Sequence, residues 1–153
     1  MNLRALKLLY PHQRQFAIEI NVSAAEQLRT ILEPENVYLE SILDFSPQRT
    51  FELVLIKGVL IHMNPDYLPQ IYDALHKSTG RYLLVCEYYN PRPVEVPYRG
   101  NADRLFKRDF CGEILDRHSD LCLVDYGFSY HRDPNFPQGD VTWFLMEKKF
   151  SGR

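Results

Sequence analysis

The stretch that decides the fold is FELVLIKGVLIHMNPDYLPQIYDAL, residues 51–75. Its first part, 51–56, is nearly all apolar, which is typical of a strand covered on both faces of a parallel sheet. Asn64 and Pro65 then form a strong helix start, because asparagine accepts free backbone N–H groups and proline suits the first turn. A buried strand followed directly by a helix is the unit from which α/β sheets are built.

Outward from this stretch, strands and helices continue to alternate. Apolar spacing predicts helices at 1–10, 23–32, 65–79 and 109–118, and strands at 15–20, 36–40, 51–56 and 81–86. Ser23 and Glu26 have capping-box spacing, and Asp109 is placed to cap the helix that runs to about His118. Gly80 is placed to end the helix that Asn64 starts. Segments 121–130 and 141–149 have no room for a helix between them and should pair as an antiparallel hairpin.

The predicted fold class is therefore α/β, a Rossmann-like, mostly parallel sheet with a C-terminal antiparallel hairpin. A chain of 153 residues fits a single domain, 1–153. An irregular segment with three prolines is expected at 91–101.

Composition excludes several classes of function. Eighteen Lys+Arg against twenty Asp+Glu give a net charge of -2, so no basic surplus favours nucleic acid. No apolar run approaches the ~20 residues of a spanning helix, and no signal-peptide cleavage site is evident. The three cysteines have no metal-ligand spacing and are expected to be reduced thiols of a cytoplasmic protein.

Polar and aromatic residues follow the predicted strands, where open parallel sheets bind ligands. They are Glu19, Ile20, Ser41, Ile42, Lys57, Gly58, Tyr88, Tyr89 and Asn90. A strand-end carboxylate can accept both hydroxyls of a ribose, and a glycine lets backbone approach a ligand closely. A solvent-facing acid and ordinary tight turns explain the same residues. His62 is a candidate general base, with a packed or cap-bonded histidine as the alternative.

Taken together, these features resemble the class I S-adenosylmethionine-dependent methyltransferases. Residues 51–75 look like the fourth strand and following helix of that family, and the terminal hairpin is typical of it. Glu19 matches the acid that holds the ribose hydroxyls, and Ser41–Ile42 match the pair that contacts adenine. Segments 87–110 and 123–148 resemble the methyltransferases associated with pseudaminic acid biosynthesis.

This resemblance implies S-adenosylmethionine as the cofactor and a small, sugar-related methyl acceptor, in nonulosonic acid biosynthesis. It places Lys57 and Gly58 under the methionine part of the cofactor, with Ile20 beside Glu19 among the cofactor-binding residues. Tyr88 and Tyr89 would face the acceptor, and His62 is the first residue to test as a base. No metal, nucleic acid or membrane partner is implied.

The chain departs from the family in one respect. Family members begin with a strand and a glycine-rich loop, whereas residues 1–11 resemble the helix that follows that loop. The missing strand would lie between 15–20 and 51–56 in the family's sheet. The expectation is an N-terminally truncated domain whose two flanking strands pair together, borrow a strand from another chain, or leave the fold poorly stable.

Two alternatives stay open. The chain could be a catalytically inactive methyltransferase-like fragment that acts by protein association, including homo-oligomerisation through exposed sheet edges. It could also be a nicotinamide-dependent dehydrogenase domain, which the strand-end acid fits. The terminal hairpin and the lack of a G-x-G-x-x-G motif argue against that second alternative.

Overall fold

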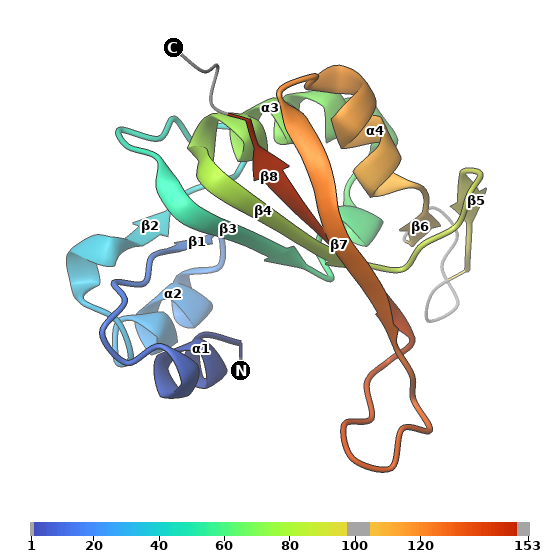
Figure 1. Ribbon diagram of the computed structural model, residues 1–153. Coiled ribbons are helices and arrows are strands. Elements are labelled where there is room, and N and C mark those ends of the chain that lie inside the picture. The colour runs from blue at the N-terminus through green and yellow to red at the C-terminus, as the bar shows by residue number, and fades with distance from the viewer. Residues whose placement is uncertain (1, 98–104, 150–153) are drawn as a thin grey trace. The chain divides into compact units, whose positions relative to one another are not determined.

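The computed structural model describes residues 2–97 and 105–149, which belong to two compact units, residues 1–46 and 47–153 (Figure 1). Helices and strands alternate along both units in the order that the sequence predicts. The predicted α/β class is confirmed, with parallel strand pairs in each unit and an antiparallel hairpin at the C-terminal end.

The first unit is a two-stranded parallel sheet with helices beside it. It contains α1 (Asn2–Leu9), β1 (Ala17–Glu19), α2 (Val22–Leu28), a 3-10 helix (Pro34–Asn36) and β2 (Val37–Leu39). β1 and β2 are in register from Ala17 opposite Val37 to Glu19 opposite Leu39. Because the two strands are parallel, their carboxyl ends lie at the same edge of this small sheet.

The second unit holds a four-stranded sheet in the order β3-β4-β8-β7 (Figure 1). Its elements are β3 (Phe51–Lys57), 3-10 helices at Leu60–His62 and Pro65–Tyr67, α3 (Leu68–Ser78), β4 (Thr79–Glu87), α4 (Phe110–Arg117), β7 (Leu121–Ser129) and β8 (Val141–Lys148). β3 and β4 pair in parallel, and β8 runs antiparallel to both β4 and β7. β4 and β7 therefore point the same way.

A short hairpin replaces part of the segment predicted to be irregular. β5 (Val94–Glu95) lies within 91–101 and pairs antiparallel with β6 (Phe106–Lys107). Residues 98–101 of that segment lie outside the described residues.

The core of the second unit fixes the sheet to α3 and α4. Its completely or almost completely buried side chains are Leu60, Leu68, Ile71, Leu83, Val85, Ile114 and Met146. Burial of one such side chain stabilises a fold by about 1.5–3 kcal/mol. The apolar face predicted for the helix after Asn64 is thus confirmed by the burial of Leu68 and Ile71.

Two predicted helix caps are correct and one is wrong. The side chains of Asn64 and Asp109 accept backbone N–H groups from Asp66 and Gly112, at 3.0 and 2.8 Å. The capping box starting at Ser23 does not form, because Asn21 lies two residues nearer to β1 and caps α2 instead. Its Oδ1 accepts from the N–H of Ala24 at 3.0 Å.

Gly80 does not end α3, as its position suggested. The helix ends at Ser78, whose hydroxyl donates back to the carbonyl of Ala74 at 2.7 Å, and Gly80 already lies in β4. There a side chain would bring its Cβ within 3.1 Å of the Phe51 carbonyl oxygen on β3. The glycine therefore serves the close approach of two strands.

The edge strands of each sheet pair on one side only within residues 2–97 and 105–149. β1 pairs only with β2, and β3 pairs only with β4. Of the three outcomes expected for segments 15–20 and 51–56, their direct pairing is not among the strand pairs of the described residues. Each open edge presents backbone N–H and C=O groups that could accept another strand.

α3 is the longest helix in the described part of the chain, with 11 residues. None of the described helices has the length and apolar character needed to cross a membrane.

Candidate functional site

The carboxyl ends of β3 and β4 bring two predicted groups of site residues to one edge of the second unit. Lys57 is opposite Cys86 in the parallel register, and the N–H of Gly58 donates to the Cys86 carbonyl at 3.0 Å. Tyr88 and Tyr89 follow β4 immediately. Residues far apart in sequence, Lys57–Gly58 and Tyr88–Tyr89, are therefore neighbours at this edge.

Gly58 makes the turn that leaves β3. Its φ of +65° lies in the left-handed region, which favours glycine because other residues meet steric strain there. No atom lies within 4 Å of the position that a Cβ would take. The requirement for glycine at this position thus comes from the backbone conformation and not from crowding.

Glu87, the last residue of β4, holds this turn in place. Its side chain is 3% exposed, and Oε1 accepts the backbone N–H groups of Val59 and Leu60 at 2.9 and 3.1 Å. Oε2 is buried and has no hydrogen-bond partner in the described part of the chain. Burial raises the pKa of Glu87, although the backbone hydrogen bonds act to lower it. Glu87 is therefore a positioning residue for the segment between β3 and α3.

His62 ends the 3-10 helix that Glu87 anchors, and its side chain is exposed. A positive charge on this imidazole acts to lower the pKa of Glu87. His62 does not line the cavity described next.

An open cavity of about 410 Å³ lies beside the end of β4. Its lining includes Tyr88, Tyr89, Leu105, Lys107, Phe128 and Asp140. These residues come from the β4 end, the segment around β6, and the hairpin formed by β7 and β8. The two tyrosines that the sequence singled out are thus in the wall of a cavity large enough for a small molecule.

Two charged residues, Lys107 and Asp140, are part of the cavity lining. The Lys107 ammonium lies 5.3 Å from the centroid of the Tyr88 ring, within the range of a cation–π contact. Asp140 pairs with His131 at 2.8 Å and accepts its backbone N–H at 3.0 Å. Hydrogen bonds from His131 lower the pKa of Asp140. The cavity therefore offers aromatic faces, an ammonium and a carboxylate to a ligand.

Lys57 and Asn90 are engaged outside the cavity. The Lys57 ammonium donates to the side-chain carbonyl of Gln138, in the hairpin loop, at 3.3 Å. The Asn90 side-chain amide donates to the backbone carbonyl of Arg92 at 2.6 Å and so holds the segment that follows β4.

The first unit places its four predicted site residues at the carboxyl edge of its own sheet. Glu19 ends β1, and its Oε1 accepts the N–H of Asn21 at 2.8 Å, which leaves Oε2 outside that bond. Ile20 is 70% exposed. Ser41 follows β2, and its hydroxyl oxygen accepts the N–H of Leu43 at 3.2 Å in a turn that includes the half-buried Ile42.

The sequence pointed to Glu87 only as one of the residues that follow the predicted strand 81–86, and it gave no sign of the partners in another segment. It missed two groups near the edge of the second unit. Lys107 and Asp140 come from two connecting segments with no motif, so the sequence carries no sign of their meeting at one cavity.

The fold is that of solved methyltransferases. The chain is similar to a SAM-dependent methyltransferase from Methanosarcina mazei, with a TM-score of 0.67 and 12% identity over 96% of this chain and 87% of that one. It is similar to the N-methyltransferase NodS from Bradyrhizobium japonicum, with a TM-score of 0.65 and 15% identity over 94% and 79%.

A third similar structure is the 1,6-didemethyltoxoflavin-N1-methyltransferase from Burkholderia thailandensis, which was solved with S-adenosylhomocysteine bound. Its TM-score is 0.60, with 12% identity over 97% of this chain and 76% of that one. No protein-family model and no curated protein sequence matches the chain. At these identities the likeness establishes the fold.

Burial of Glu87 predicts a pH dependence of stability. Because its pKa is raised above 4.5 in the folded chain, the unfolded chain ionises first as the pH rises. The stability that Glu87 contributes is fully present below about pH 4.5 and is lost as the pH passes through the raised pKa. The free energy of unfolding of the wild type should therefore fall relative to Glu87→Gln as the pH rises from about 4.5 through the raised pKa, as measured by urea unfolding.

Glu52→Gln is the matched control, because it removes the same charge from a side chain that is 74% exposed. Comparison of the two variants isolates the buried carboxyl group. A constant difference between wild type and Glu87→Gln across this pH range would contradict the assignment.

Proposed function

We propose that this chain is an S-adenosylmethionine-dependent methyltransferase that acts on a small molecule. The observation that carries the proposal is the methyltransferase fold, shared with a solved enzyme that binds S-adenosylhomocysteine. Open α/β sheets bind ligands at the carboxyl ends of their strands, where the residues predicted for the site are found. When bound, the cofactor supplies an electrophilic methyl group on a sulfonium centre.

The first unit supplies the proposed contacts to the adenosine part of the cofactor. Glu19 would accept the ribose hydroxyls, since its Oε1 is oriented by Asn21 and its Oε2 is outside that bond. Ser41 and Ile42 would contact the adenine edge and face, with the exposed Ile20 beside the ribose. The donor set fits the group, because a carboxylate and a neighbouring hydroxyl are what a ribose and an adenine require.

Lys57 and Gly58 are proposed, from the family resemblance, to contact the methionine part, and the left-handed turn at Gly58 exposes backbone next to open space.

The proposed acceptor is a small, sugar-related molecule, with a nonulosonic acid as the leading candidate. The cavity beside Tyr88 and Tyr89 supports this, because aromatic faces pack against the C–H faces of sugars. Lys107 would pair with the carboxylate of an acidic sugar. Catalysis would depend mainly on orienting the acceptor. His62 is the proposed base, and because it is not part of the cavity lining, the acceptor would have to extend beyond the cavity to reach it.

The proposed location is the cytoplasm. Cys86, Cys111 and Cys122 are all free thiols, which suits a reducing compartment.

Glu19→Gln tests the cofactor assignment. Wild type should bind S-adenosylhomocysteine in isothermal titration calorimetry, and the variant should bind about tenfold more weakly or worse, because a charged hydrogen bond to ribose is lost. Glu26→Gln is the control, since it removes the same charge from an exposed position in α2. Absence of binding by the wild type, or equal affinity of Glu19→Gln, would contradict the proposal.

Tyr89→Ala tests the acceptor cavity. Saturation-transfer NMR with free pseudaminic acid should give a signal with the wild type and at least a severalfold weaker signal with this variant, because one aromatic wall is removed. Tyr126→Ala is the control, since Tyr126 lies on β7, is 64% exposed and is not part of the cavity lining. An unchanged signal from Tyr89→Ala would contradict the proposal that this cavity binds the acceptor.

A non-catalytic role in protein association is the second candidate. It is favoured by β3, which pairs on one side only within the described part of the second unit. Self-association through this edge would give a dimer or larger species in light scattering, and a monomer at high protein concentration would contradict it.

A further inference from the structure

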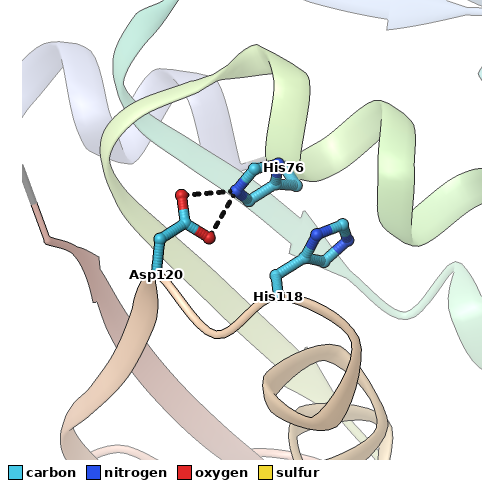
Figure 2. Close-up of side chains that lie close together, drawn as sticks. All are labelled: His76, His118 and Asp120. Atoms are coloured by element: carbon cyan, nitrogen blue, oxygen red, sulfur yellow. Dashed lines mark hydrogen bonds and ion pairs between the residues drawn. The ribbon is translucent and has the colours of Figure 1, made fainter. Parts of the chain in front are cut away.

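A cluster of two histidines and an aspartate lies at the end of the second unit opposite to the cavity. His76 is in the last turn of α3, His118 follows α4, and Asp120 directly precedes β7 (Figure 2). β4 and β7 begin at this end of the sheet and finish at the other. β4 has nine residues, and its eight steps of about 3.3 Å give a strand roughly 26 Å long. This length separates the cluster from the cavity.

The three side chains converge closely. His76 Nε2 lies 2.9 Å from both carboxylate oxygens of Asp120 (Figure 2). The imidazoles of His76 and His118 are stacked, with ring centroids 4.0 Å apart and an interplanar angle of 1°. One ligand atom from each residue can be chosen so that all three lie within 4.8 Å of one another.

His118 contributes an unsatisfied polar atom. Its side chain is 12% exposed, and its Nε2 is buried without a hydrogen bond to any residue that the structure describes. Asp73 Oδ1 lies 3.3 Å away, but the two oxygens of Asp73 accept from Arg117 at 2.7 Å each.

We propose that His76, His118 and Asp120 form a binding site for a divalent transition-metal ion, with Zn²⁺ as the best-fitting ion. Two imidazole nitrogens and one carboxylate oxygen are a ligand set that zinc accepts, with a fourth position left for water. The metal would satisfy the buried nitrogen of His118. The hydrogen bond between His76 and Asp120 would give way to bonds from both residues to the metal.

Metal binding requires a small local closure. Zinc bonds of about 2.0–2.1 Å place tetrahedral ligand atoms about 3.3 Å apart. The ligand atoms lie within 4.8 Å of one another, so the largest approach needed is roughly 1.5 Å. The imidazoles must also turn out of their parallel stack, which side-chain rotation at the C-terminal end of α4 can provide.

The charge around the cluster is mixed. The Asp120 carboxylate favours a cation, as hard oxygen ligands do. The Lys148 ammonium is 4.0 Å from Asp120 and donates to the carbonyls of His76 and Thr79 at 3.1 and 3.3 Å. Lys148 opposes a cation, and moderate affinity is therefore expected.

The consequence of metal binding would be structural. The ion would join the end of α3 to the connection between α4 and β7. These helices are already linked by Tyr72, whose hydroxyl donates to Glu113 at 2.7 Å, and by the ion pair of Asp73 with Arg117. A ligand that binds only the folded state raises its stability in proportion to the logarithm of its concentration.

Titration of the chelator-treated full chain with ZnCl₂ tests the site. Calorimetry should show a zinc site in the wild type, and the zinc affinity should fall by more than about 100-fold in His118→Gln. Loss of a group that only hydrogen-bonds to a metal ligand can already lower metal affinity by up to about 100-fold. Asp120→Asn should also weaken binding, and circular dichroism of both variants checks that they fold. His131→Gln is the control, because it removes a histidine from another His–Asp pair and should bind zinc like the wild type.

Cobalt substitution distinguishes this site from the three free cysteines. Co²⁺ should give visible absorption of a tetrahedral nitrogen–oxygen site in the wild type and lose it in His118→Gln. An intense thiolate-to-cobalt band that persists in His118→Gln would overturn the proposal. Failure of the wild type to bind zinc, or unchanged affinity in both ligand variants, would also overturn it.

Discussion

The second unit depends on one buried contact, the carboxylate of Glu87 bound to the N–H groups of Val59 and Leu60. Parallel pairing aligns β3 with β4 but does not determine the path of the chain beyond β3. The Glu87 side chain does so, because it reaches from the end of β4 to the segment that follows Gly58. A buried carboxylate is costly unless it is hydrogen-bonded. The contact therefore allows one path for the chain and fixes the edge of the sheet beside the cavity.

Local signals account for most of what the sequence predicted. The apolar run 51–56 and the caps at Asn64 and Asp109 act through residues a few positions apart, and the structure confirms all three. Ser23 was a plausible cap, but Asn21 occupied the position nearer to the strand. Gly80 is a residue type that often ends helices, but the close approach of β3 to β4 is the reason for a glycine at this position. Such choices depend on tertiary neighbours that no local pattern contains.

The candidate sites were predicted only where one segment supplies the residues. Tyr88 and Tyr89 were found because they follow a strand, whereas Lys107 and Asp140 join them through folding alone. The cluster of His76 with His118 and Asp120 has the same origin, since its residues come from two helices' ends and a connecting segment. The two ends of the sheet thus have separate chemistry: a ligand cavity at the carboxyl edge and a compact ligand set at the other.

The central claim is that Glu19 and Ser41, at the carboxyl edge of the first unit's sheet, bind the nucleoside part of the cofactor. The most direct measurement is a titration of the ¹⁵N-labelled chain with S-adenosylhomocysteine, followed by amide chemical shifts. We expect shifts with a common dissociation constant at Glu19 and Ser41, and none near Asp120. Shifts that cluster around Asp120, or a spectrum without changes at millimolar ligand, would contradict it.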